Sequence, residues 1–217
     1  MGQAPSQSGM QQKSNPKESA GKGDAKARAE LPVVAFVDAS AWGAWLASNH
    51  ASSRGVWLKI GKKSASHASI TYAEAVERAL VWGWIDGQKR ALDATWWLQR
   101  FTPRGPRSPW SKINRGKAEA LIVAGTMKPP GMAEVERARS DGRWERAYES
   151  QSRAVVPPDL AKALAANPRA ARFFETLESY NRYAILYRIH GAKKAETRAA
   201  RIAKFIGMLE RHEKVHP

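Results

Sequence analysis

Tryptophan is the residue that most constrains how this chain can fold, because each of its nine indoles needs cover and an acceptor for its N–H. Trp82, Trp84 and Trp110 lie within residues 82–114, a turn-rich segment that also carries Asp86 and a run of basic side chains. A polar segment with this much tryptophan predicts one specific shape, with a pocket or a docking face. It does not identify a reaction.

Charge is the second constraint. The chain has 36 Lys and Arg against 20 Asp and Glu, a formal net charge of +16. Residues 1–30 hold five bases and three acids, so +14 belongs to residues 31–217. Such an excess attracts polyanions such as nucleic acid, anionic lipid or an acidic protein. It is also a common route to solubility, so charge alone does not name a partner.

Composition excludes several classes of protein. The chain has no cysteine, which rules out disulfides, thiolate catalysis and Cys-based zinc or iron–sulfur sites. No apolar run is long enough for a transmembrane helix, and the first residues lack the apolar core of a secretory signal. We therefore expect a cytoplasmic protein that uses no cofactor.

Composition also predicts three segments. Residues 1–30 contain no aromatic residue and are rich in Gln, Ser, Gly and Lys, which predicts a disordered tail. We predict an α+β domain at 31–150 and a helical module at 151–217, divided within the polar, proline-ended stretch 149–158. The expected fold class is α+β: a small antiparallel sheet with packed helices, followed by a helical C-terminal module.

Local signals place the main elements. The β-branched and aromatic run 56–60 predicts a strand, and Thr71 with Glu74 forms a capping box that starts a helix. Residues 85–90 and 95–102 are extended, aromatic-rich runs around a short polar connection, which predicts an antiparallel hairpin. After Ser111 the periodicity becomes helical, with Asn167-Pro168 as one helix start.

Asp86 is the centre of the predicted pocket. An antiparallel hairpin returns Arg104 towards the Trp84–Asp86 end, so we expect an ion pair between Asp86 and Arg104 covered by two indoles. The alternative is that Asp86 caps a turn or forms a purely structural salt bridge. The candidate pocket residues are Trp84, Asp86, Arg104, Trp110, Lys112 and Asn114.

Two basic runs form a second candidate site. The first includes Trp110, whose ring could stack on a base while the cations contact phosphates. The second lies on one face of the predicted last helix. The alternative for both is a solvated basic surface. The residues are Arg107, Arg115, Lys117, Lys194, Arg198 and Arg201.

No complete catalytic or metal motif is present. Residues 212–216 read H-E-x-x-H, but zinc chemistry at that motif needs a third ligand, and we interpret the segment as a solvated chain end. Residues 55–64 resemble a phosphate-binding loop, but five residues instead of four separate the glycines. We expect no metal site.

Several strings between Asp38 and Glu213 resemble a bacterial family, the bacteriocin-protection, YdeI/OmpD-associated proteins. From Val156 onward the chain looks like the helical domain that gives the family its name. The resemblance implies protection from peptide antimicrobials and association with an outer-membrane porin, and it transfers no catalytic residue. The matching strings are WLKIGKKS, ITYAEAVERALVWGWIDG, RFTPRGPRSPWSKIN, SDGRWERAY, VPPDL and AKKAETRAARI.

The leading interpretation is therefore a non-enzymatic binding or stress-protection protein of this family. A nucleic-acid-binding protein that uses the basic, tryptophan-bearing surface is the alternative, and an enzyme with Asp86 in its pocket comes third. The expected partner is an unidentified protein or small molecule, with a polyanion or nucleic acid as a further candidate.

Overall fold

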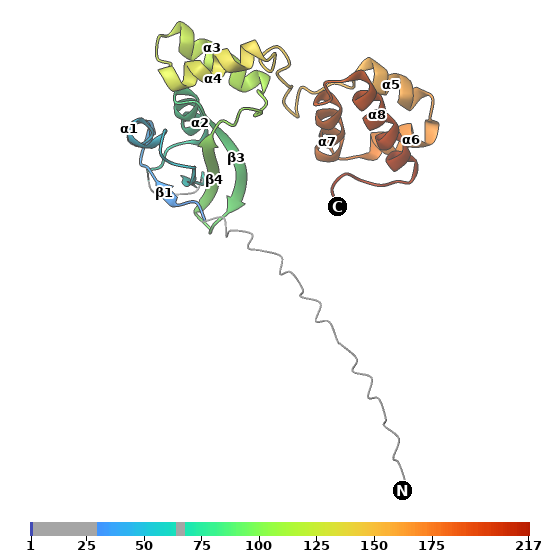
Figure 1. Cartoon of the computed structure of the whole chain (residues 1–217), viewed down its shortest axis with the longest axis horizontal. Helices are drawn as coiled ribbons and strands as arrows, with labels where there is room; N and C mark the ends of the chain where they lie inside the picture. The colour runs from blue at the N-terminus through green and yellow to red at the C-terminus, as the bar shows by residue number, and fades with distance from the viewer. Residues whose placement is uncertain (2–29, 64–67) are drawn as a thin grey trace. The chain divides into compact units, whose positions relative to one another are not determined.

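The computed structural model describes residue 1, residues 30–63 and residues 68–217 (Figure 1). The predicted tail at 1–30 therefore lies almost wholly outside the described residues. The described elements are, in chain order, β1 (Val33–Ala35), α1 (Ala39–Asn49), β2 (Val56–Gly61), α2 (Tyr72–Val81), β3 (Trp84–Ala91), β4 (Trp96–Pro103), α3 (Lys112–Val123), α4 (Pro129–Ser140), α5 (Pro158–Ala165), α6 (Pro168–Thr176), α7 (Ser179–His190) and α8 (Ala195–Glu210).

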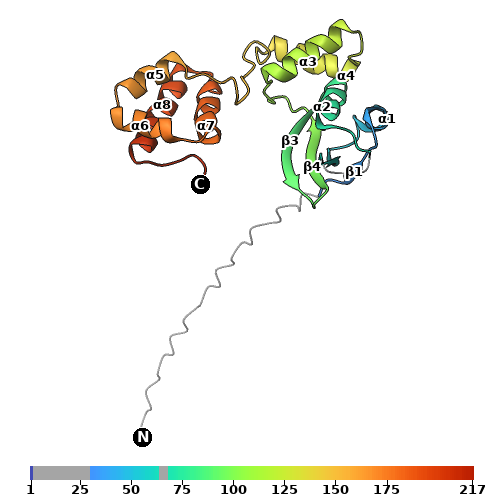
Figure 2. The same cartoon turned by 180° about the vertical axis from the view of Figure 1, so that it is seen from behind.

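One four-stranded sheet, in the order β1-β2-β4-β3, confirms the α+β class. The predicted hairpin is present as β3 and β4, and β4 also pairs antiparallel with β2. The short strand β1 runs parallel to β2, so the sheet is mixed rather than antiparallel throughout. A strand of three residues is too short to show the alternation from which strands are predicted. Figure 2 shows the same hairpin from behind.

The hairpin contains one irregularity. The pairing of β3 with β4 shifts between Asp86 and Lys89, so β3 carries an extra residue there. The Gln99 side chain, only 3% exposed, donates hydrogen bonds from its amide to the carbonyls of Gly87 at 2.9 Å and Gln88 at 3.2 Å. A buried side chain thus satisfies the backbone groups that the bulge leaves outside the strand ladder.

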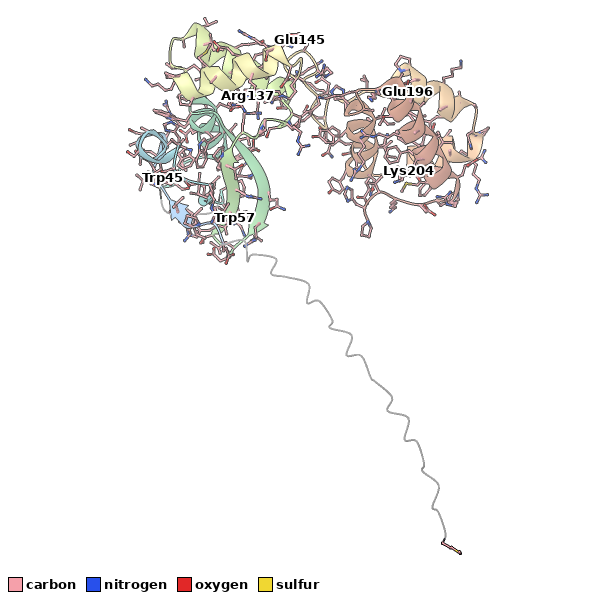
Figure 3. All side chains as sticks on the ribbon, viewed as in Figure 1. Trp45, Trp57, Arg137, Glu145, Glu196 and Lys204 are labelled. Atoms are coloured by element: carbon pink, nitrogen blue, oxygen red, sulfur yellow. The ribbon has the colours of Figure 1, made fainter. Side chains whose placement is uncertain are left out.

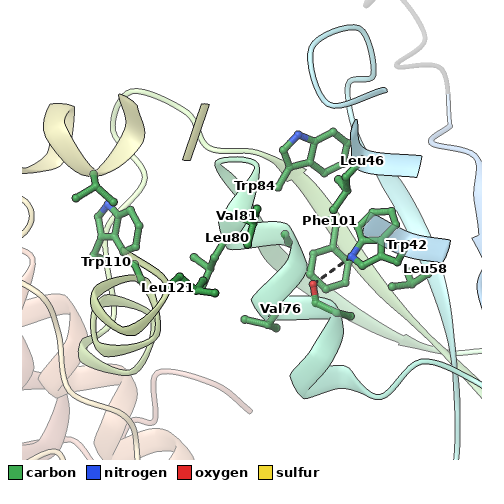
Figure 4. Packing of buried hydrophobic residues seen from close by; sticks show 14 of the residues in the cluster. Trp42, Leu46, Leu58, Val76, Leu80, Val81, Trp84, Phe101, Trp110 and Leu121 are labelled. Atoms are coloured by element: carbon green, nitrogen blue, oxygen red, sulfur yellow. Dashed lines mark hydrogen bonds between the residues drawn. The ribbon is translucent and has the colours of Figure 1, made fainter. Parts of the chain in front are cut away.

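The first hydrophobic cluster, which we call the tryptophan cluster, extends from α1, α2 and the sheet to α3 and α4, and its buried indoles include Trp42, Trp84, Trp110 and Trp144 (Figure 4). Two of its indoles are fixed by hydrogen bonds from Nε1: Trp42 donates to the Ala75 carbonyl at 3.1 Å and Trp84 to the His50 carbonyl at 3.2 Å. Their rings meet edge to face with centroids 6.3 Å apart. These bonds satisfy the single donor that a buried indole carries.

The capping box predicted at the start of α2 is also present. The Glu74 N–H donates to the Thr71 hydroxyl at 3.3 Å, and the Thr71 N–H donates to the Glu74 carboxylate at 2.9 Å. The Thr71 hydroxyl also donates to the Glu74 carboxylate at 2.7 Å, and this bond, together with that from the Thr71 N–H, lowers the pKa of Glu74. The box fixes the residue at which α2 begins, and α2 leads into β3, the first strand of the hairpin.

The second hydrophobic cluster, the helical cluster, lies among α5 to α8 (orange to red in Figure 1). Leu160, Ile189 and Leu209 are fully buried in it. Asn167 caps α6 as predicted, because its side chain accepts a hydrogen bond from the Ala170 N–H at 3.1 Å. All aromatic residues of this cluster are phenylalanines, and none of its members is a tryptophan.

The segment between α4 and α5 is held at several points. The Tyr148 N–H donates to the Trp110 carbonyl at 2.9 Å, and the Lys112 N–H donates to the Tyr148 carbonyl at 2.8 Å. Further along, the Tyr183 hydroxyl of α7 donates to the Glu149 carbonyl at 2.9 Å. Leu31–Pro217 form one compact unit, and the predicted boundary near residue 150 stays a prediction. No helix within the described ranges is long and apolar enough to cross a membrane.

Candidate anion-binding site

The predicted pocket residues are neighbours without forming the expected ion pair: the Arg104 N–H donates to the Gly83 carbonyl at 3.0 Å, and burial lowers the pKa of Arg104 against the charge of Asp86, which raises it. Trp84 lies in the tryptophan cluster, and the partly buried Asp86 accepts a hydrogen bond from the Tyr72 hydroxyl at 2.6 Å. Burial and this hydrogen bond raise the pKa of Tyr72. The ion pair that we expected between Asp86 and Arg104 is absent from the part of the chain that the structure describes.

Arg104 has a different partner. It is 4% exposed and its guanidinium lies over the Trp110 ring, 3.6 Å from the centroid. Its Nη1 donates to the Pro109 carbonyl at 3.3 Å, while Nε and Nη2 have no hydrogen-bond partner among the described residues. Burial lowers the pKa of Arg104 to about 10, against the opposing effect of Glu134. Pro103 ends β4, and Arg104 follows it in the loop that leads to Trp110, so its side chain extends towards that ring.

Trp110 cannot stack on a nucleic-acid base, because it is 2% exposed. Its ring contacts Trp144 edge to face at 4.8 Å, and Figure 4 shows it beside Leu121 and well apart from Trp42 and Trp84. The basic surface predicted around an exposed Trp110 therefore lacks its aromatic element.

The remaining predicted pocket residues also have local partners. Lys112 is exposed and forms an ion pair with Glu149 at 2.5 Å. Asn114 lies in the first turn of α3, where its N–H donates to the capping Ser111 hydroxyl at 3.1 Å.

The predicted basic surface is partly neutralised. Arg115 pairs with Glu119 at 2.9 Å and with Glu145 at 3.5 Å, and Arg198 pairs with Asp159. Lys117 is half-buried on α3, and Lys194 is the exposed N-cap residue of α8. The other two, Arg107 and Arg201, lie far apart in the sequence but line the same cavity.

That cavity, which we call the cationic cavity, has a volume of about 680 Å³. Three parts of the chain form it: residues 106–109, residues 141–148, and residues 187–205 of α7, α8 and the link between them. Seven Arg and Lys side chains line it, together with His190, against one acid, Asp141. Besides Arg107 and Arg201, the basic residues are Arg143, Arg146, Arg188, Lys193 and Lys204 (Lys204 is labelled in Figure 3).

The single acid of the cavity is already paired. Arg143 Nε donates to the Asp141 carboxylate at 2.7 Å, and this hydrogen bond lowers the pKa of Asp141. The other cations therefore face one another without a counterion among the residues that line the cavity. Like charges in a concave site focus a strong positive potential, which an anion would relieve.

Arg143 is the most buried of these cations, at 7% exposure. Its Nη1 donates to the Ser108 carbonyl at 2.8 Å, while Nη2 is buried without a hydrogen-bond partner in the described chain. A buried guanidinium nitrogen without a partner is costly, so Arg143 keeps an unsatisfied positive group beside the cavity.

Backbone contacts hold the cations around the cavity. Gly142 has a φ of +73° at the end of α4, and the Arg146 guanidinium donates to the Asp141 carbonyl at 2.9 Å. A ring nitrogen of His190 lies 2.9 Å from the Arg146 carbonyl, and the Arg201 guanidinium donates to the Arg188 carbonyl. The basic side chains are thus partly ordered without any ligand, which lowers the entropy cost of binding one.

Two tyrosines also line the cavity. The Tyr148 and Tyr187 rings meet edge to face with centroids 4.9 Å apart. Burial raises the pKa of Tyr148 to about 12, and burial also raises the pKa of Tyr187. Neither hydroxyl donates a hydrogen bond to another described residue, so both are available to a ligand.

Sequence reasoning identified only two cations of this cavity. The signal for the others was the excess of Arg and Lys over acids in residues 137–146 and 188–204, but periodicity within one helix cannot show that these two segments meet. The two histidines of the H-E-x-x-H segment pack on aromatic rings: the His212 ring stacks on Phe173 and the His216 ring packs on Tyr180. Within the described residues no group of three His, Asp or Glu could hold a metal ion.

Fold and cavity together describe an α+β protein with a helical C-terminal portion and a cavity lined by seven Arg and Lys side chains. Residues 153–212 match the family model described as bacteriocin-protection, YdeI or OmpD-associated, which confirms the resemblance for that part of the chain. Residues 34–134 match a model described as a domain of unknown function. No curated protein and no solved structure matches the chain.

Proposed function

We propose that this chain is a non-enzymatic binding protein that holds a phosphate-bearing ligand in the cationic cavity. The observation that carries this proposal is the convergence of seven Arg and Lys side chains on one cavity whose single acid is already paired. Guanidinium groups bind phosphate oxygens through two parallel hydrogen bonds, which makes phosphate the anion best matched to an arginine-rich site.

A small ligand fits the cavity better than nucleic acid does. Its volume of about 680 Å³ lies within the range of small-molecule sites. The nucleic-acid alternative relied on Trp110 as a stacking platform, and that ring is buried. The enzyme alternative relied on Asp86 as a pocket carboxylate, and that carboxylate already accepts a hydrogen bond from the Tyr72 hydroxyl.

The family description supplies the biological context. The model matched by residues 153–212 names bacteriocin protection, and α7 and α8, which supply much of the cavity, lie within that match. We propose that ligand binding in this cavity underlies a stress-protection role of this chain.

Isothermal titration of the full chain with inorganic pyrophosphate tests the proposal. The test variant is Lys193→Gln with Lys204→Gln, which removes two exposed cavity cations. The control is Lys162→Gln with Lys214→Gln, which removes the same charge from exposed positions outside the cavity lining. We expect the cavity variant to weaken pyrophosphate binding by about tenfold, a change of about 1.4 kcal/mol.

Affinity should also fall as salt rises, because screening weakens interactions between exposed charges. Equal losses in the two double variants would mean that the net charge alone attracts the anion. Absence of pyrophosphate binding at low salt would reject the cavity as an anion site.

A further inference from the structure

A second cavity adjoins the cationic one and differs from it in character. It has a volume of about 230 Å³, and its walls include Val155, Pro157 and Leu186. Tyr148, Tyr187 and His190 line both cavities. Lys112, Glu149 and Arg198 also line the smaller cavity, and Lys112 and Glu149 form an ion pair. A ligand seated in the cationic cavity can therefore extend past these shared rings towards an apolar wall.

We infer that the ligand is a nucleoside 5′-phosphate, with its phosphate in the cationic cavity and its base in the smaller cavity against the tyrosines. This inference rests on the proposed function, and it adds the chemical class of the ligand. It depends on aromatic, apolar and cationic surfaces that lie next to one another in one continuous site.

The aromatic surface suits a planar ring. Tyr187 is 37% exposed although its ring also contacts Tyr148 and Tyr183, whose centroids lie 4.9 Å and 6.0 Å away. A half-exposed ring among other aromatic rings offers a flat surface on which a base can stack, and stacking requires no particular base sequence.

The apolar surface is otherwise unexplained. Val155 is 79% exposed at the edge of the smaller cavity, although a β-branched apolar side chain is better placed under cover. A base bound there would cover part of it. The unpartnered hydroxyls of Tyr148 and Tyr187 lie where they could donate to a base or a sugar.

The arrangement also explains why the two parts of the ligand need a spacer. Arg188 and Arg201 line the cationic cavity only, whereas Pro157 and Leu186 line the smaller cavity only. A ring and a phosphate that occupy both cavities must be joined across the shared tyrosines and His190. A pentose between base and phosphate supplies that link.

Titration of the full chain with AMP and with ribose 5-phosphate tests the inference, because the two compounds differ only in the base. We expect AMP to bind about tenfold more tightly than ribose 5-phosphate, as one stacked base allows. Tyr187→Leu should remove this advantage, and it should weaken AMP binding several-fold more than ribose 5-phosphate binding, because only AMP has a base to stack on the ring. Tyr187→Phe, which keeps the ring, should retain most of it.

Two further variants keep the test decisive. Tyr180→Leu removes an exposed tyrosine from the same helix but outside both cavities, and it should leave both affinities unchanged. Val155→Trp, at an exposed position that folding does not require to be valine, should block the smaller cavity and selectively weaken AMP binding.

The outcomes separate this inference from the proposed function. Equal affinities for AMP and ribose 5-phosphate, with pyrophosphate still bound through Lys193 and Lys204, would overturn the nucleoside assignment alone. Absence of pyrophosphate binding would overturn both. A single-stranded oligonucleotide that binds more tightly than AMP and depends on Tyr187 would replace the free nucleotide by nucleic acid as the ligand.

Discussion

The tryptophan cluster and the helical cluster both consist of buried apolar side chains, but their chemistry differs. In the first, the Trp42 and Trp84 indoles pack edge to face and each donates its N–H to one carbonyl, whereas the buried Trp110 N–H has no hydrogen-bond partner among the described residues. In the second, aliphatic side chains and phenylalanine interdigitate between short helices, with no polar atom to place. A buried indole therefore specifies direction as well as volume, whereas Leu160 or Leu209 specifies volume alone.

The largest predicted effects come from emptying each cluster at a fully buried position. Trp42→Ala should lower the free energy of unfolding by about 3–5 kcal/mol and Leu160→Ala should lower it by about 2–5 kcal/mol, because each leaves a cavity that the surroundings fill only in part. We propose that residues 31–150 and 151–217 unfold as separate domains. Calorimetry of the full chain should then show two transitions, each lowered by only one of the two variants.

Two controls define that experiment. Trp42→Phe keeps an aromatic ring but loses the hydrogen bond to Ala75. Its free energy of unfolding should therefore lie between that of the parent and that of Trp42→Ala. A single transition that both alanine variants lower to the same extent would show that the two clusters unfold together.

An intermediate effect is expected where each half of the molecule uses a tyrosine hydroxyl. Tyr72 donates to the Asp86 carboxylate and Tyr183 donates to the Glu149 carbonyl. In urea unfolding, Tyr72→Phe should lower the free energy of unfolding by about 1–2 kcal/mol and Tyr183→Phe by about 0.5–1 kcal/mol. The first loss is larger because a hydrogen bond to a carboxylate is stronger than one to a carbonyl.

The partner variant sharpens this comparison. In the Asp86→Asn background, Tyr72→Phe should cost less, since the two residues form one interaction and their effects are not additive. If the losses in the free energy of unfolding from the two substitutions are additive, Tyr72 and Asp86 contribute independently. The coupling energy of their hydrogen bond would then be zero.

A further predicted effect appears only at alkaline pH. The pKa of Tyr148 is raised by burial from 10.0 to about 12, so the folded chain keeps a proton that the unfolded chain releases between those values. This contribution is fully present below pH 10.0 and is lost as the pH rises to about 12. Tyr148→Phe should therefore lose less thermal stability than the parent between these two pH values.

Arg104 acts in the opposite direction. Its pKa is lowered by burial to about 10, so the folded chain loses this proton first and stability rises with pH above that value. Tyr148 and Arg104 also influence each other's pKa, so Tyr148→Phe removes the effect of Tyr148 on Arg104 as well. Identical alkaline melting curves for parent and Tyr148→Phe would show that Tyr148 titrates alike in the folded and unfolded chain.

Local sequence signals predicted much of the fold. The capping box at Thr71, the start of α6 at Asn167 and the hairpin of β3 and β4 are all set by residues close together in the chain, and all are present. The matched family over residues 153–212 was also recognised from its strings. These features depend on neighbours within a few positions, which a single sequence displays.

The candidate site could not be predicted in the same way. Antiparallel pairing correctly returned the chain near Arg104 to the Trp84 end, and the Arg104 N–H does donate to the Gly83 carbonyl at 3.0 Å. Pairing does not fix where a side chain points beyond the last paired residue, so Arg104 reached Trp110 instead of Asp86. The cationic cavity depends on contact between segments some 40 residues apart, such as that of His190 with Arg146.

The Gln99 amide that fills the bulge in β3 has a consequence for the surface chemistry of the sheet. Successive strand residues point to opposite faces, so one extra residue exchanges the faces of everything that follows it. After the bulge, Lys89 lies over the Trp97 ring at 4.4 Å and Arg90 lies over the Trp57 ring at 4.3 Å. Without that residue the two cations would trade sides, and each indole would lose the positive charge that now covers it.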